Sequence, residues 1–182
     1  FKDKTALDCE GTISVSYEEL DRISDEMSGA LLERGLVEGS LILLSLPTSI
    51  EYLIAYIAAS KIGVITAGIN PRLKAPERES ICEIAEPNLV ITTIELSYGI
   101  SPEIPVEIIE IAENKEKLLT ELRLNSFQPK KLNDNLDRPV CVCFTSGSTG
   151  TPKGALFTNK QLLAIQKMDT EGVWGSGGHL VP

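Results

Sequence analysis

Histidine is nearly absent from this sequence of 182 residues, in which His179 is the only one. We therefore expect neither a His-rich metal site nor a histidine-dependent triad within the chain. The four cysteines, Cys9, Cys82, Cys141 and Cys143, form no Cys-x-x-Cys pair, so the zinc patterns built on such pairs are excluded. We expect them to be buried free thiols in a reducing cytosol, which indicates a cytoplasmic protein.

Positive charge and long apolar runs are also scarce. The chain has 17 Lys and Arg against 26 Asp and Glu, giving a net charge of −9. Nucleic acid and anionic membrane surfaces are therefore poor candidates as partners. The longest strongly apolar stretch, residues 41–46, is too short to cross a bilayer, so we expect no transmembrane segment. The 42% apolar content is sufficient for the core of one globular domain.

The hydrophobic pattern predicts strands alternating with helices. Two extended runs joined at Glu10-Gly11 predict a hairpin. Ser16 and Glu19 form a capping box that opens a helix closed by Gly35. Further apolar periodicity predicts helices over 17–34, 49–62 and 76–85. Apolar runs predict buried strands over 41–46 and 64–67 and further strands over 89–92, 106–111 and 140–144. This alternation predicts the α/β class, with a mainly parallel sheet and flanking helices.

Residues 112–138 are the least regular part of the sequence. We expect a short charged helix over 113–124 and a polar connector over 130–138. Glu107, Glu110 and Glu113 are interpreted as solvated side chains.

A glycine- and hydroxyl-rich motif follows the strand at 140–144. It reads Thr145-Ser146-Gly147-Ser148-Thr149-Gly150-Thr151-Pro152-Lys153-Gly154, and a short strand over 155–158 and a helix from Asn159 follow it. Glycines let backbone N–H groups wrap an anion, hydroxyls donate to phosphate oxygens, and lysine adds positive charge. The spacing matches neither the P-loop of kinases and GTPases nor the dinucleotide fingerprint. A flexible turn between two strands is the non-functional alternative.

Segment 144–154 resembles the signature phosphate loop of the AMP-forming acyl- and aryl-CoA synthetases, adenylation domains and luciferases. Segments upstream are similar to successive landmarks of the same large domain: 16–20, 35–39, 47–51, 61–63 and 70–73 with Glu77. The resemblance covers nearly the whole chain. Departures from the family pattern occur at Ser40, Ala67 and Asn159, outside the phosphate loop.

The resemblance implies that residues 1–182 are an incomplete N-terminal portion of the AMP-binding domain, which is the large N-terminal domain of adenylate-forming enzymes. The remainder of that domain and the C-terminal domain are absent from this sequence. The intact enzyme would be an AMP-forming acid–thiol ligase. Its substrate would be a carboxylic acid, specifically a fatty acid, which it would convert to an acyl-adenylate and then to an acyl-CoA. It would use ATP, Mg²⁺ bound mainly through the ATP phosphates, and coenzyme A.

The same resemblance assigns roles within the loop. It assigns catalysis to Lys153 and cofactor binding to Thr145, Ser146, Gly147, Ser148, Thr149, Gly150, Thr151, Lys153 and Gly154, with no protein metal ligand. We expect this chain alone to be inactive and to self-associate through uncovered apolar surface.

Three alternatives remain open. The chain could belong to an adenylation domain or acyl-AMP ligase that loads a carrier protein. It could be a non-catalytic nucleotide-binding or interaction fragment. An unrelated phosphate-loop ATPase is disfavoured by the spacing of the lysine. His179 does not match the family's pocket histidine, and Trp174 is interpreted as a loop anchor or core residue rather than a ligand contact.

Overall fold

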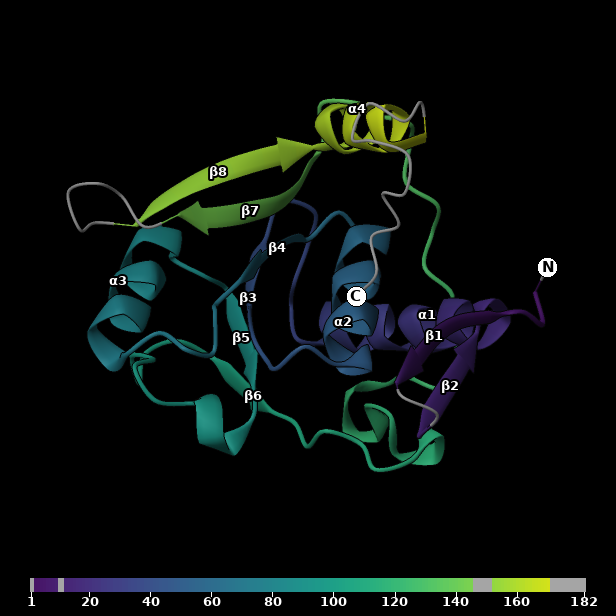
Figure 1. Cartoon of the computed structure of the whole chain (residues 1–182), viewed down its shortest axis with the longest axis horizontal. Helices are drawn as coiled ribbons and strands as arrows, with labels where there is room; N and C mark the ends of the chain where they lie inside the picture. Colours follow the sequence, from purple (N-terminus) through teal and green to yellow (C-terminus); the bar gives the residue numbers. More distant parts are fainter. Residues whose placement is uncertain (1, 10–11, 146–151, 171–182) are drawn as a thin grey trace.

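The fold is seen in a computed structural model that describes residues 2–9, 12–145 and 152–170 (Figure 1). A six-stranded sheet has the order β6-β5-β3-β4-β7-β8, and a separate two-stranded sheet pairs β1 with β2. The large sheet is parallel except for β8, which pairs antiparallel to β7. Its strands are β3 (Leu41–Ser45), β4 (Ile65–Gly68), β5 (Leu89–Thr92), β6 (Val106–Ile108), β7 (Pro139–Thr145) and β8 (Lys153–Thr158). The expected α/β class with a mainly parallel sheet is confirmed.

The N-terminal hairpin leads directly into the first helix. β1 (Thr5–Cys9) pairs antiparallel with β2 (Ile13–Ser16), and α1 (Tyr17–Glu33) begins at the next residue. The Ser16 hydroxyl accepts from the Glu19 N–H at 3.2 Å, while the Glu19 carboxylate accepts from the Ser16 N–H at 2.9 Å. The predicted capping box is therefore confirmed, and the chain leaves α1 through Gly35, whose φ of +81° favours glycine.

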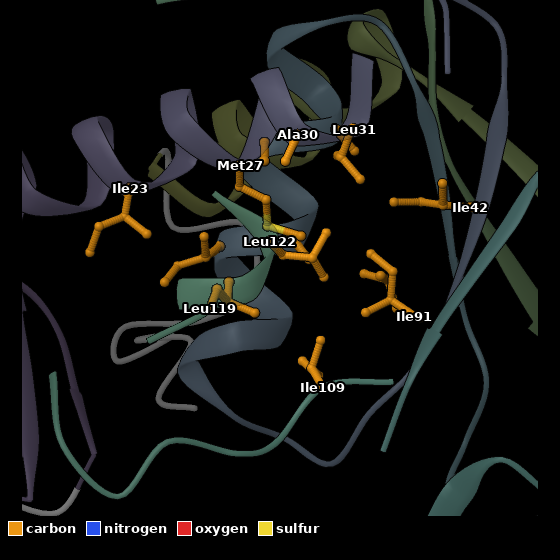
Figure 2. Packing of buried hydrophobic residues seen from close by; sticks show 14 of the residues in the cluster. Ile23, Met27, Ala30, Leu31, Ile42, Ile91, Ile109, Leu119 and Leu122 are labelled. Carbon is orange, nitrogen blue, oxygen red and sulfur yellow. The ribbon is translucent and has the colours of Figure 1, made fainter. Parts of the chain in front are cut away.

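Helices α1 and α2 (Ile50–Lys61) cover one face of the large sheet. Figure 2 shows Met27 and Leu31 of α1 in the same buried cluster as Ile42 of β3 and Ile91 of β5. Ser49 caps α2 by accepting from the Tyr52 N–H, as its position before the apolar run predicts.

Helix α3 (Ala75–Ala85) covers the opposite face, so the sheet lies between two helical layers (Figure 1). Leu43 and Val90 pack there against Ile81. Because consecutive residues of β3 enter different clusters, the strand is apolar on both faces, which explains its unbroken hydrophobic run.

The predicted helix over 113–124 is wrong. The segment contains two 3₁₀ turns instead, η2 (Lys115–Lys117) and η3 (Thr120–Leu122), and a further turn, η1 (Ile94–Leu96), follows β5. Leu119 lies between η2 and η3 and adopts a left-handed φ of +51°, which interrupts any continuous helix. The burial of Leu118, Leu119 and Leu122 in the core offsets the strain of that conformation. Figure 2 shows Leu119 and Leu122 within this core.

Strand β6 is shorter than the predicted 106–111. The strand ends at Ile108, although the Ile109 N–H still donates to the Thr92 carbonyl of β5 at 2.8 Å. The Ala112 N–H then donates to the Glu51 carboxylate of α2 at 2.8 Å, which directs the chain away from the sheet. The interpretation of Glu107 as simply solvated is also wrong: its carboxylate accepts from Arg34 Nε at 2.5 Å.

All four cysteines are free thiols, as expected, but their burial differs. Cys82 is buried, Cys141 is half-buried, and Cys9 and Cys143 are exposed, so uniformly buried thiols were the wrong expectation. No helix within the described ranges combines the length and apolar character needed to cross a membrane.

The connector before β7 has no regular structure, as predicted. The Arg138 guanidinium at its end binds the Glu38 carboxylate through Nε at 2.9 Å. The last helix, α4 (Asn159–Thr170), follows β8 without a break, and Asn159 Nδ2 donates to the Asn135 carbonyl at 2.9 Å. These contacts attach the connector to the turn before β3 and to the start of α4.

Candidate phosphate-binding site

The predicted phosphate loop lies between β7 and β8. Residues 146–151, which include Ser146, Gly147, Ser148, Thr149, Gly150 and Thr151, lie outside the described residues, as do Trp174 and His179. The two ends of the loop are described: Thr145 pairs with Lys153 in the antiparallel register, and the Thr145 hydroxyl donates to the Lys153 carbonyl at 3.4 Å. The fold thus closes the loop at its base and brings the first hydroxyl and the lysine of the motif together.

The base of the loop lies at the carboxyl edge of the parallel sheet. Thr145 ends β7, and Gly68 ends the neighbouring parallel strand β4. Ligands of open α/β sheets bind outside the carboxyl ends of the strands. The position of the motif therefore agrees with a ligand-binding role for it.

Lys153 and Gly154 have different surroundings. Lys153 is exposed at the start of β8, where its charge is available to a ligand. A Cβ atom at Gly154 would lie 2.9 Å from Val142 Cγ1 and 3.2 Å from Phe144 Cε1. A side chain at 154 would therefore force the Val142 side chain to shift, which gives this glycine a packing role against β7 independent of any contact with a phosphate.

A cavity of about 540 Å³ opens beside the base of the loop. Its wall combines the end of β7 with the turn after β4 and the first turns of α3, and it is lined by Gly68, Asn70, Leu73, Pro76, Glu77, Ser80, Ile81, Phe144, Thr145 and Pro152. The Glu77 carboxylate accepts from the Lys74 N–H at 2.9 Å and so caps the start of α3. A larger hollow of about 870 Å³ lies along the 128–136 connector, away from this edge of the sheet.

Arg78 of α3 supports the wall of the smaller cavity, and the sequence pattern did not identify it. Its side chain is fully buried; Nε donates to the Tyr98 carbonyl at 2.8 Å and Nη2 to the Ser45 hydroxyl at 2.5 Å, while the guanidinium lies 4.5 Å from the Tyr98 ring centre. The Tyr98 hydroxyl in turn donates to the Leu73 carbonyl at 3.0 Å. Burial lowers the pKa of the Arg78 guanidinium, although nearby Tyr98 and Cys82 act in the opposite direction. The available signal was an arginine three and four residues before the buried Ile81 and Cys82, on the apolar face of the helix.

Metal ligands do not gather at this edge. Among the described residues, no group of three or more His, Cys, Asp and Glu side chains could hold a metal ion. A magnesium ion bound chiefly by ATP phosphates requires no such protein group.

Comparisons with known proteins give one consistent family. The family described as AMP-binding enzyme matches residues 1–178. The 4-chlorobenzoate–CoA ligase of Arthrobacter sp is 27% identical over 179 residues, covering 95% of this chain and 34% of the ligase. The dimodular nonribosomal peptide synthase of Bacillus subtilis is 27% identical over 162 residues, covering 88% of this chain and 7% of the synthase.

Solved structures show the same fold. The O-succinylbenzoate coenzyme A synthetase of Bacillus subtilis, in complex with AMP, has a TM-score of 0.72 at 21% identity, covering 93% of this chain and 43% of that one. The chain therefore spans less than half of each of these three proteins.

Proposed function

This chain belongs to the family of AMP-binding enzymes, and from that premise we propose that it is the N-terminal portion of the AMP-binding domain of an enzyme that activates a carboxylic acid with ATP. The observation that carries the proposal is the β7–β8 hairpin, which holds Thr145 and Lys153 opposite each other at the carboxyl edge of the sheet. Residues beyond this chain would supply the base pocket, the ribose contact and the acid-binding pocket.

The proposed reaction begins with attack of a substrate carboxylate oxygen on the α-phosphorus of ATP. The new bond is O–P, the bond between the α-phosphorus and the bridging oxygen to the β-phosphate breaks, and pyrophosphate leaves with the electron pair. Magnesium bound to the phosphates would offset part of their negative charge. No residue of this chain acts as nucleophile, because the substrate provides it.

The chain's own contribution is to position and neutralise the leaving phosphates. Lys153 is exposed at the base of the loop, and we assign to its ammonium group the role of neutralising negative charge on the departing pyrophosphate. We assign to the Thr145 hydroxyl, on the strand opposite Lys153, a contact with the phosphates. Gly147 and Gly150 are assigned the role of letting backbone N–H groups approach the phosphates closely. Ser146, Ser148, Thr149 and Thr151 complete the proposed hydroxyl set, with Gly154 closing the loop against β7.

The second half-reaction is proposed to be transfer of the acyl group to a thiol. In the first candidate, the sulfur of coenzyme A attacks the acyl carbon and its proton passes to the solvent. The bond from the acyl carbon to the phosphate oxygen of AMP breaks, AMP leaves with the electron pair, and a fatty acyl-CoA forms. In the second, the thiol belongs to a carrier protein. Both candidates are kept because the ligase and the peptide synthase relatives are equally similar, at 27% identity.

The first experiment measures carboxylate-dependent exchange of pyrophosphate into ATP by the full-length protein, with fatty, aromatic and amino acids as substrates. Lys153→Ala should lose about 1.5–3 kcal/mol of transition-state stabilisation, which is a decrease of about 10- to 150-fold in the exchange rate, with little change in the carboxylate KM. Lys160→Ala is the matched control, because this exposed lysine lies on α4 and only its backbone N–H is engaged, with the Leu136 carbonyl. An unchanged rate in Lys153→Ala would contradict the assignment.

A second measurement separates the two acceptors. With an active carboxylate identified by exchange, coenzyme A and an acyl carrier protein are supplied separately, and thioester formation is followed by mass spectrometry. Acyl-CoA alone supports the ligase, and acylation of the carrier protein alone supports the adenylation domain. Residues 1–182 produced by themselves are expected to show no exchange.

A further inference from the structure

The hydrogen-bonding capacity of the Arg78 guanidinium is only partly used. Its side chain is fully buried, yet Nη1 has no hydrogen-bond partner among the described residues. Nε donates to the Tyr98 carbonyl at 2.8 Å, and Nη2 donates to the Ser45 hydroxyl at 2.5 Å and to the Leu96 carbonyl. Every acceptor that these donors reach within the described ranges is neutral. Because an unpaired buried donor costs free energy, stabilisation of the fold does not by itself account for an arginine here.

The bonds of Arg78 join three segments at the carboxyl edge of the sheet. Ser45 ends β3, and Tyr98 follows η1, which comes directly after β5. This last segment packs tightly on α3, since a Cβ atom at Gly99 would lie 2.8 Å from the Ala75 carbonyl oxygen. Arg78 therefore holds the first turns of α3 against the end of β3 and the segment after β5.

One route leads from Arg78 through Tyr98 to the cavity beside the candidate phosphate loop. The Tyr98 ring centre lies 4.5 Å from the guanidinium carbon, and the Tyr98 hydroxyl donates to the Leu73 carbonyl at 3.0 Å. Leu73 lines the same cavity as Thr145, the first residue of the motif. The turn after β4 is thus tied to the buried arginine.

A second route passes through the apolar face of α3. Ile81 lies one turn after Arg78 and belongs to the buried cluster against which Phe144 packs. Phe144 immediately precedes Thr145, and it lies close enough to Gly154 of β8 that a Cβ atom there would be 3.2 Å from Phe144 Cε1. Figure 1 shows α3 beside this end of the β7–β8 hairpin. The position of α3 is therefore transmitted to both strands at the base of the loop.

We propose that Arg78 is a positioning residue for the reaction, which fixes α3 and thereby the base of the phosphate loop. The guanidinium is buried, so it acts through other residues rather than on the substrate. The inference rests on the proposed function, in which Lys153, paired with Thr145 at that base, acts on the phosphates. Displacing a reacting group by about 1 Å can lower a rate by about 100-fold, so loosening the base should reduce the contribution of Lys153.

The first test is a cycle of single and double variants of the full-length protein, measured by pyrophosphate exchange. Arg78→Lys should lower the exchange kcat about tenfold or more, with little change in the carboxylate KM. In a Lys153→Ala background the same change should cost less than about threefold, because residues that act as one unit are not additive. Tyr98→Phe removes only a hydroxyl and should show the same coupling with a smaller loss. Arg123→Lys is the matched control: this arginine pairs with Glu26 of α1 on the other face of the sheet, so any loss should be equal in both backgrounds.

Hydrogen–deuterium exchange of the same proteins gives a readout that needs no activity. Peptides covering 139–145 and 152–158 should take up deuterium faster in Arg78→Lys than in the wild type, while those of α1 should not; Arg123→Lys should give the reverse. Unchanged deuterium uptake at the loop base, or equal rate losses for Arg78→Lys with and without Lys153, would overturn this inference alone. An unchanged pyrophosphate exchange rate in Lys153→Ala would overturn the proposed function, and the role of Arg78 in the reaction with it.

Discussion

Glu26 of α1 offers the sharpest test of how the fold is held together. Its side chain is only 6% exposed and binds two arginines: Arg22 at 3.0 Å, which is 53% exposed, and Arg123, which is 13% exposed. Arg123 Nε donates to the carboxylate at 2.7 Å, and Nη1 donates to the Leu118 carbonyl at 3.2 Å. One carboxylate therefore has a solvent-exposed partner four residues away and a buried partner far along the chain.

The loss of unfolding free energy on removing Arg123 should be several-fold larger than the loss on removing Arg22. Removing one member of a buried ion pair costs about 3–5 kcal/mol, because the other charge remains desolvated. An exposed pair four residues apart on a helix contributes about 0.3–0.5 kcal/mol. Against a total stability of about 5–15 kcal/mol, Glu26→Ala and Arg123→Ala should each be strongly destabilising, and Arg22→Ala nearly neutral.

The assay is urea unfolding at pH 7, followed by far-ultraviolet circular dichroism. The double variant Glu26→Ala/Arg123→Ala should be more stable than the sum of the single effects predicts, with a coupling of about 0.5–3 kcal/mol. Equal losses for Arg22→Ala and Arg123→Ala, or zero coupling, would refute the assignment of the buried pair as the one that attaches 118–124 to α1.

Two further predictions concern α1. Gly29→Ala should destabilise the protein by about 1–3 kcal/mol through overpacking, because the new Cβ would lie 2.5 Å from Phe127 Cγ. This cost should outweigh a helix-propensity gain of about 1 kcal/mol. In a Phe127→Ala background, urea unfolding should show a smaller cost for the same change, and an equal cost would refute the contact. The hydrogen bond from Lys115 is the main cause that lowers the pKa of Glu19 to about 2. This value is below the unfolded-state pKa of about 4.3, so ionised Glu19 stabilises the folded state. That contribution to the unfolding free energy is fully present above a pH of about 4.3 and is lost as pH falls toward 2. Lys115→Ala should reduce the wild-type loss of unfolding free energy between pH 5 and pH 2, and an identical acid profile in that variant would contradict the interpretation.

Much of the architecture was predictable because it depends on interactions between near neighbours in sequence. The Ser16–Glu19 capping box, the φ of Gly35 and the cap at Ser49 each involve residues at most four apart. The unbroken apolar run of β3 predicted burial on both faces, and hence a parallel sheet between helices. The expected strand before the glycine–hydroxyl motif is confirmed as β7, while the assignment of the motif itself as a phosphate site stays a prediction.

Other features depend on residues that only the folded chain brings together. The 113–124 segment has helical charge spacing, yet pairing of Lys115 and Arg123 with two carboxylates of α1, together with burial of its leucines, holds it in 3₁₀ turns. Glu107 looked solvated because its partner Arg34 lies 73 residues away.

Arg78 shows the same division most clearly. A charged residue in a helix is expected to face water, and sequence offers no sign of its acceptors, which come from Ser45 and Tyr98, 33 and 20 residues away. Local sequence thus determined where helices and strands begin and which faces are apolar. Tertiary structure alone decided which buried charges are tolerated, because the free energy of a buried charge is set by acceptors contributed by distant segments.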